Sequence, residues 1–228
     1  MTSKLDDISS PDKPFLSVIM TASDHGPYII PEYFKPKPNE LTKQIIEYAD
    51  WSIGKFISNA KIKSWFSNTI FVFIADHGAA LSPSYEMPIN YHHSPLIFYA
   101  PNILREPKAY SQIGGQIDVF PTIMGLLNFE YVNNTFGIDL LKEKRPYIYF
   151  SADDKYGVLS DSLFLIVNNQ SKESLFKYKY ADEKDYITAH KKIAGEMKQY
   201  AASNMQTAQY IIKNNKQYIK LEEPVHSK

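Results

Sequence analysis

Three consecutive residues, Asp76, His77 and Gly78, directly follow the apolar run TIFVFIA at residues 69–75. Carboxylate and imidazole groups are both common ligands of divalent metals, and a glycine lets the backbone turn sharply after them. If the run is a buried strand, its end is a rigid mount on which the two side chains can meet one ion. Two ligands alone do not hold a catalytic metal. The ordinary alternative is an Asp that caps a helix beside a hydrogen-bonded His.

Two further apolar runs adjoin polar residues of the same kinds. FLSVIMT at residues 15–21 is followed by Asp24 and His25, and PLIFYAP at residues 95–101 is preceded by His93. Functional groups in open parallel sheets gather beyond the carboxyl ends of the strands. One hypothesis is therefore a self-contained zinc or manganese site. Its candidate ligands are Asp24, His25, Asp76, His77 and His93.

These candidates need a sheet to position them, and the apolar patterns predict one. A continuous apolar run of about four to eight residues between turn residues is typical of a buried strand, and an apolar period of about 3.6 is typical of a helix. We expect strands at residues 15–21, 69–75, 95–101, 146–151, 156–161, 162–167 and 175–180. We expect helices at residues 39–57, 116–127 and 185–214.

This order of elements predicts an α/β fold. Strands alternate with helices in the first 130 residues, which indicates a partial, mostly parallel sheet flanked by helices. The later strands indicate a C-terminal antiparallel strand subdomain, followed by a long terminal helix. The uneven apolar stripe of that helix favours packing on the sheet over a membrane-surface role. The expected parts are a flexible segment at 1–14, the α/β part at 15–145, the antiparallel subdomain at 146–184, and the helix and tail at 185–228.

Composition excludes several classes of function. The chain has 228 residues, which suits one large domain or two small ones. Lys and Arg together number 25, as do Asp and Glu, so the zero net charge gives no basis for a nucleic-acid partner. The absence of cysteine excludes disulfides, thiolate catalysis and zinc–thiolate sites. The polar start and the lack of an apolar run of about 18 residues lead us to expect a soluble chain.

Several segments resemble, in order, those of the alkaline phosphatase superfamily, in the sulfatase and phosphoglycerol transferase branch that includes lipoteichoic acid synthases. FVFIADHG resembles the metal-binding strand end of that family, and PFLSVIMTASDHGPY resembles its strand with a Thr-x-x-x-His-x-Pro-Tyr segment. IIEYADWSIGKFI is similar to the helix before the Asp-His strand, and YHHSPLIFYAPN to the His-x-Pro-Leu strand after it. GGQIDVFPTIMGLLN, TFGIDLL and YGVLSDSLFLIV are similar to the later segments, so the resemblance covers residues 14–180.

The resemblance implies a role for each matched residue. Asp76 and His77 would be metal ligands, and His25 and His93 would contact the substrate. The cofactor would be a divalent cation (Mn, Zn, Mg or Ca) that lowers the pKa of a Thr or Ser nucleophile. Glu47 stands where lipoteichoic acid synthases carry a substrate-binding histidine, so we assign it no such role. Asp50 and Asp118 are expected to be structural, capping or solvated carboxylates without a role in catalysis.

The family places its nucleophile upstream of the segment matched by FLSVIMT, so no catalytic residue is assigned in this chain. We expect the C-terminal part of a metal-dependent phosphoglycerol transferase or phosphodiesterase that acts on phosphate or sulfate esters and shows little turnover alone. The alternative is a non-catalytic interaction or ligand-binding module derived from the same fold. By resemblance, the whole protein would work at the outer face of the bacterial cytoplasmic membrane or in the periplasm. We also expect self-association through exposed sheet.

Overall fold

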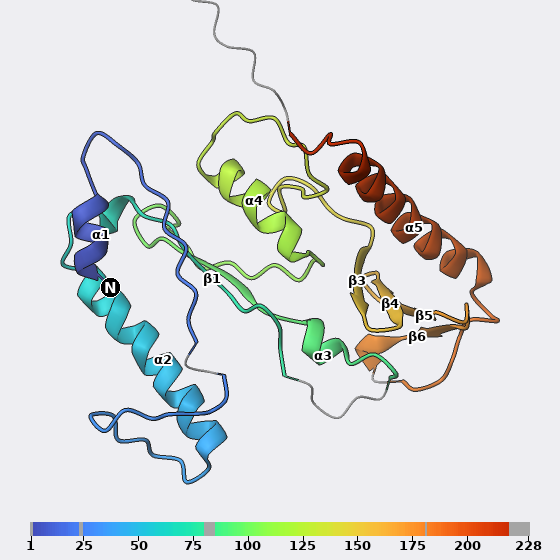
Figure 1. Ribbon diagram of the computed structural model, residues 1–228, viewed down its shortest axis with the longest axis horizontal. Helices are drawn as coiled ribbons and strands as arrows, with labels where there is room; N and C mark the ends of the chain where they lie inside the picture. Colours follow the sequence, from blue (N-terminus) through green and yellow to red (C-terminus); the bar gives the residue numbers. More distant parts are fainter. Residues whose placement is uncertain (1, 23–24, 80–84, 181, 219–228) are drawn as a thin grey trace, which may run out of the picture. The chain divides into compact units, whose positions relative to one another are not determined.

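The structure is a computed structural model that describes residues 2–22, 25–79, 85–180 and 182–218. The chain divides into two compact units (Figure 1). Unit 1 comprises Met1–Ile74 and Pro95–Lys108, and unit 2 comprises Ala75–Ser94 and Ala109–Lys228. The candidate site residues fall in both units, because His25 belongs to unit 1 whereas Asp76, His77 and His93 belong to unit 2. The predicted domain boundaries stay predictions.

Unit 1 is built from helices and one two-stranded sheet. Its elements are α1 (Thr2–Ile8), α2 (Leu41–Ala60), a 3-10 turn η1 (Phe66–Asn68), β1 (Phe71–Ile74) and β2 (Leu96–Tyr99). The two strands pair antiparallel, with Phe71 opposite Tyr99 and Ile74 opposite Leu96. One aromatic-rich core joins these elements, and it is formed by Leu5, Ala60, Trp65, Phe66 and Phe71. The strand expected at residues 69–75 is thereby confirmed as β1, which leads directly into Asp76 and His77.

Three expectations for this unit differ from the structure. The mostly parallel sheet is not confirmed, because β1 and β2 run antiparallel. A parallel pair needs a crossover that usually runs through a full helix, whereas the described residues between β1 and β2 contain only the four-residue helix α3 (Ile89–His92). Residues 15–21 form no strand, since no neighbouring strand pairs with them among the described residues. The segment expected to be flexible contains α1, whose Leu5 is buried in the core.

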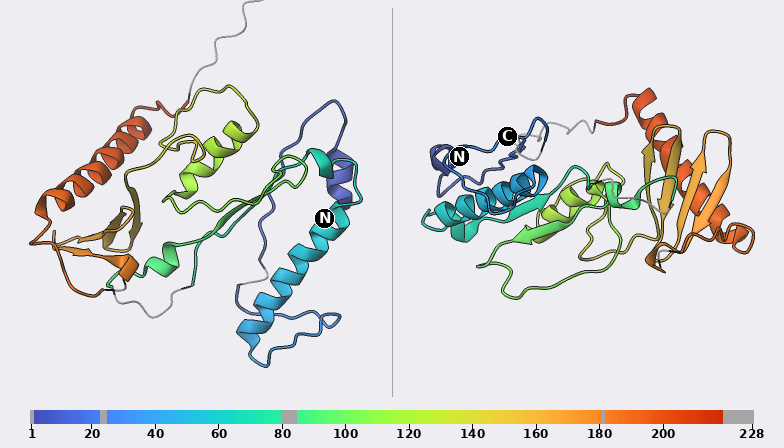
Figure 2. Two further views of the ribbon diagram at one scale, coloured as in Figure 1. Left: turned by 180° about the vertical axis from the view of Figure 1, so that it is seen from behind. Right: turned by 90° about the horizontal axis from the view of Figure 1, so that it is seen from below.

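Unit 2 contains a four-stranded antiparallel sheet in the simple order β3-β4-β5-β6 (Figure 2). This confirms the antiparallel subdomain predicted from the later strands. The strands are β3 (Ile148–Ala152), β4 (Lys155–Leu159), β5 (Phe164–Asn168) and β6 (Glu173–Phe176). The helical elements are α3 (Ile89–His92), η2 (Gln116–Asp118), α4 (Val119–Leu126), η3 (Tyr178–Tyr180) and α5 (Lys191–Lys213).

Both faces of this sheet are covered. Alternate residues of a strand point to opposite faces, so Leu165 and Val167 of β5 lie in one core and Phe164 and Ile166 in the other. The first core also contains Ala194, Met197 and Ala201, which places α5 against the sheet (Figure 2). The second core contains Met87, next to α3.

The long terminal helix is confirmed, and its packing agrees with the interpretation favoured by its apolar stripe. It begins at Lys191 and not at residue 185, because the Asp185 carboxylate accepts hydrogen bonds from the backbone N–H groups of Leu175 and Ile187 (3.0 and 2.8 Å). These bonds hold the preceding segment on the edge strand β6. Among the described residues, no helix combines the length and apolar character that a bilayer crossing requires.

A buried ion pair fixes the loops around α4. The Arg145 guanidinium donates to both carboxylate oxygens of Asp118, and both residues are buried. Asp118 also accepts the backbone N–H groups of Gly115 (2.8 Å) and Ile138 (2.9 Å). A buried carboxylate with this many partners is a structural group, as we expected of Asp118.

Candidate functional site

The structure places Asp76 and His77 side by side immediately after β1. The His77 Nε2 and Asp76 Oδ2 atoms are 3.8 Å apart, and the two side chains are 49% and 91% exposed respectively. The backbone N–H of His77 donates to Asp76 Oδ1 (2.9 Å), which orients the carboxylate toward the imidazole. The pair is therefore open to an ion or a substrate, and neither side chain is taken up by the core.

The hydrogen bonds of His77 leave one ring nitrogen free to bind a metal. Its Nδ1 lies 2.8 Å from the carbonyl oxygen of Gly78, which can only accept, so Nδ1 carries the proton of this bond. In the neutral ring, Nε2 then has the lone pair that a metal requires. Two atoms that each lie about 2.1 Å from a tetrahedral metal are about 3.4 Å apart. The 3.8 Å separation of Nε2 from Asp76 Oδ2 is close to that value, so the pair fits as two metal ligands.

A close approach between helix α3 and the chain that follows β1 holds His77 in place. The backbone N–H of Gly78 donates to the carbonyl oxygen of Tyr91 (2.7 Å). The Tyr91 ring stacks on the His77 ring, with centroids 4.4 Å apart and an interplanar angle of 23°. A Cβ atom at position 78 would lie 2.1 Å from the Asn90 carbonyl oxygen and 2.8 Å from that of His93, so only glycine fits there. Sequence reasoning missed Tyr91 because nothing local links it to the Asp-His pair.

Gln116 supports the same site from η2. Its side-chain amide donates to the carbonyl oxygens of Ala75 (3.0 Å) and Asp76 (2.7 Å). These bonds satisfy two carbonyl groups at the point where the chain leaves β1, and they orient the backbone that carries the pair. The matched segment GGQIDVFPTIMGLLN contained this glutamine, which was the available signal, but its partners are 40 and 41 residues away in the chain.

The two adjacent histidines of the YHHSPL segment have different environments. His93 follows α3 and is exposed, as a residue that contacts substrate must be. The His92 ring stacks on Phe150, with centroids 4.4 Å apart, and its Nε2 atom is buried without a hydrogen-bond partner in the described part of the chain. Burial lowers the pKa of His92 and so favours its neutral form. His92 packs α3 against the sheet, and His93 remains the candidate for substrate.

His25 is exposed in unit 1, and its Nδ1 is hydrogen-bonded to the carbonyl oxygen of Gly26 (2.8 Å). Its role as a substrate contact stays a prediction. Glu47 accepts the backbone N–H of Lys37 (2.8 Å), which gives this carboxylate a structural partner. Asp24 lies outside the described residues.

The described residues contain no group of three or more His, Cys, Asp or Glu side chains placed to hold a metal. The self-contained five-residue site therefore has no support in this part of the chain. Asp76 and His77 fit as a pair of ligands, and further ligands are needed for a catalytic ion.

Comparison with known proteins identifies related chains. The family model described as Sulfatase matches residues 1–129 of the 228. The lipoteichoic acid synthase-like protein YvgJ of Bacillus subtilis is 28% identical in an alignment of 162 residues, and the match covers 60% of this chain and 26% of that protein.

Solved structures extend the likeness over nearly the whole chain. A protein of the alkaline phosphatase superfamily from Vibrio parahaemolyticus is 25% identical with a TM-score of 0.81, over 96% of this chain and 54% of that one. The structure of BT4656, solved with its substrate D-glucosamine-2-N,6-O-disulfate, has a TM-score of 0.56 at 18% identity, over 79% of this chain and 42% of that one. The chain thus spans about half of the solved relatives and about a quarter of YvgJ.

Proposed function

This chain belongs to the sulfatase family, and from that premise we propose that it supplies the metal- and substrate-binding part of a site that cleaves or transfers phosphate or sulfate esters. Asp76 and His77 would hold a divalent cation, and His25 and His93 would contact the ester. The nucleophile and the remaining ligands would come from the rest of a sulfatase-type domain, of which this chain spans about half.

One observation carries the proposal. The Asp76 carboxylate and the His77 Nε2 lone pair stand 3.8 Å apart at a strand end, and both side chains are exposed. An ion bound there supplies positive charge that neutralises the charge developing on a phosphoryl or sulfuryl oxygen. The protein's own part is to hold the two ligands rigidly, which it does through the Gly78–Tyr91 hydrogen bond and the Gln116 amide.

The finer activity we propose is that of a phosphoglycerol transferase or phosphodiesterase. The likeness to the lipoteichoic acid synthase-like protein YvgJ supports the phosphate ester. The substrate in the BT4656 structure is a sulfated sugar, and the likeness to that protein shows the fold alone. The Asp-His pair serves either ester, because both reactions build negative charge on an oxygen of a tetrahedral group.

Metal titration tests the proposal. We expect Mn²⁺ to bind the full chain in isothermal titration calorimetry, and Asp76→Ala and His77→Ala each to weaken binding by at least about tenfold. The matched controls Asp50→Ala and His190→Ala should leave the affinity unchanged. Equal Mn²⁺ affinity in the wild type and both site variants would contradict the proposal and favour the non-catalytic module.

Turnover separates a partial site from a complete one. With Mn²⁺ present, we expect the chain alone to hydrolyse p-nitrophenyl phosphate no faster than the Asp76→Ala variant does. Hydrolysis that depends on Asp76 in this chain alone would show instead that the site is self-contained.

A further inference from the structure

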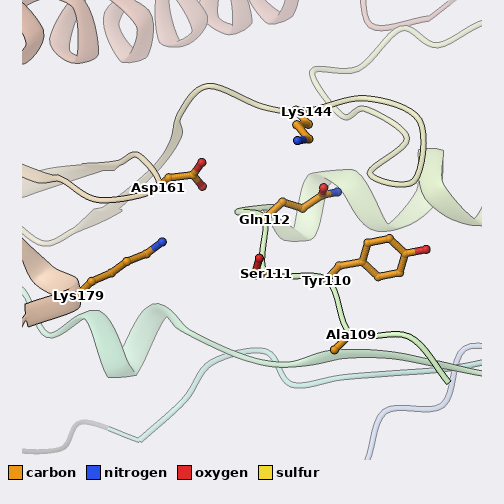
Figure 3. Close-up of a pocket in the computed structure, with 7 residues that line it drawn as sticks. All are labelled: Ala109, Tyr110, Ser111, Gln112, Lys144, Asp161 and Lys179. Atoms are coloured by element: carbon orange, nitrogen blue, oxygen red, sulfur yellow. The ribbon is translucent and has the colours of Figure 1, made fainter.

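A polar hollow of about 310 Å³ lies within unit 2, and none of the candidate metal or substrate residues lines it (Figure 3). Its volume is at the lower end of small-ligand sites, which begin at about 300 Å³. Four separate segments contribute to its lining. The side chains that carry charge or hydrogen-bonding groups include Ser111, Gln112, Lys144, Asp161 and Lys179.

Hydrogen bonds hold the walls of this hollow in place. The Gln112 amide donates to the carbonyl oxygen of Leu140. This bond ties the lining segment 109–112 to the loop that carries Lys144. Lys144 directly precedes Arg145, which is fixed by its buried ion pair with Asp118.

Hydrogen bonds also hold the part of the lining that contains Asp161 and Lys179. The Tyr178 hydroxyl group lies 3.0 Å from the carbonyl oxygen of Ser160 and 3.2 Å from that of Asp161. This contact links the β4–β5 turn to η3, which carries Lys179. The hollow is thus a preformed feature, and a ligand would meet walls that are already ordered.

The charged side chains around the hollow form no ion pairs among the described residues. Lys144 and Lys179 take part in none of the ion pairs of this part of the chain, and neither does Asp161. Figure 3 shows the Lys179 ammonium and the Asp161 carboxylate directed toward the side on which Ser111 lies. Two ammonium groups and one carboxylate give the hollow a net charge of +1, which matches a single negative charge on a ligand.

We propose that this hollow binds one singly charged oxyanion ester, a phosphodiester or a sulfate monoester, attached to a polyol or a sugar. Lys144 and Lys179 would take the oxyanion, because lysine ammonium groups bind phosphate-type oxygens as point charges. Asp161 accepts hydrogen bonds from the hydroxyl groups of the carrier, and Ser111 both donates and accepts. The proposal does not depend on the metal site, and it adds a recognition site for the class of ester on which the family acts.

The test uses the full chain in EDTA, so that its outcome is independent of metal binding. Glycerophosphoglycerol and glucose 6-sulfate are titrated separately and followed by ¹H–¹⁵N NMR shifts, which distinguishes a phosphate from a sulfate ligand. We expect saturable shifts at residues 109–112 with at least one probe. Lys144→Gln and Lys179→Gln should each weaken the affinity about threefold, and the double variant about tenfold.

Lys192→Gln is the matched control, since it removes an exposed lysine of α5 that does not line the hollow. It should leave the affinity unchanged. If neither probe shifts residues 109–112, or if Lys192→Gln weakens binding as much as the two lining variants do, the proposal is overturned. Thermal unfolding of each variant checks that its fold is intact.

Asp161→Asn tests the part of the proposal that concerns the carrier. With the carboxylate neutral, we expect inorganic sulfate to bind about threefold more tightly, because a repulsive charge is lost. The preference for glucose 6-sulfate over inorganic sulfate should fall, because the amide is a weaker acceptor for sugar hydroxyl groups. An unchanged affinity for both ligands would place Asp161 outside the site and overturn the assignment.

Discussion

Gly78 is the residue on which the position of the Asp76–His77 pair depends. No glycine of the described chain has a positive φ, so the requirement at position 78 is space and not an unusual backbone conformation. The Asn90 carbonyl oxygen occupies the place that a Cβ atom would take, at 2.1 Å. Because that neighbour is backbone, no side-chain rotation can relieve the contact.

We predict that Gly78→Ala lowers the free energy of unfolding by about 2 kcal/mol, the typical cost of forcing extra atoms into a filled space. It should also weaken Mn²⁺ binding, since the displaced loop carries His77. Chemical denaturation and calorimetry measure the two effects. The matched control is Gly195→Ala in α5, where a Cβ atom meets nothing within 4 Å. There, alanine should stabilise the helix by about 0.5–1 kcal/mol. Equal stability of the two variants would contradict this account.

At the scale of elements, α5 covers one face of the four-stranded sheet in unit 2. Ala194, Met197 and Ala201 lie three and four residues apart, so they share one helix face, and all three are fully buried against the sheet. Two of the three are alanines, which allows the helix to approach the strands closely. Met197 therefore supplies most of the apolar side-chain volume at this contact.

Met197→Ala should lower the free energy of unfolding by about 2–5 kcal/mol, because it removes buried methylene groups and leaves a cavity under the helix. Tyr210→Ala on the same helix is the control, since Tyr210 is 55% exposed, and it should change stability by less than about 0.5 kcal/mol. Urea denaturation followed by circular dichroism measures both. A similar loss in the two variants would mean that α5 is not held by this face.

At the scale of the whole molecule, residues 15–21 of unit 1 carry a row of exposed apolar side chains. Leu16, Val18 and Met20 are 80%, 87% and 95% exposed. They alternate along residues 15–21, where a strand was expected and where no strand pairs among the described residues. An apolar row on an unpaired extended chain is a surface that other chains can cover.

We therefore keep the expectation of self-association and predict that the triple variant Leu16→Ser, Val18→Ser and Met20→Ser weakens it by at least about tenfold, because three apolar side chains leave the contact. Sedimentation equilibrium over a range of concentrations measures the association constant. Ile62→Ser is the control, since Ile62 is 84% exposed and lies outside this row. A wild-type chain that stays monomeric at high concentration would show the prediction to be wrong.

Most helices and strands were predictable from the sequence, because their signals are local. The apolar run before Asp76 predicted β1, and the period of residues 39–57 predicted α2. The runs after residue 145 predicted four strands and their antiparallel class. The Asp-His-Gly triplet also identified the candidate ligands, since residue type and position at a strand end are properties of a short segment.

The direction in which β1 and β2 pair, and the contacts that hold Asp76 and His77 in place, depended on the tertiary structure. Whether β1 and β2 run parallel or antiparallel is decided by the path of the chain between them. The stacking of Tyr91 on His77, the hydrogen bonds from Gln116 to the end of β1 and the polar hollow around Lys144 each join segments that are far apart in the chain. Periodicity and residue type report how a segment meets its immediate neighbours. Contacts between distant segments arise only when the cores form and bring those segments together.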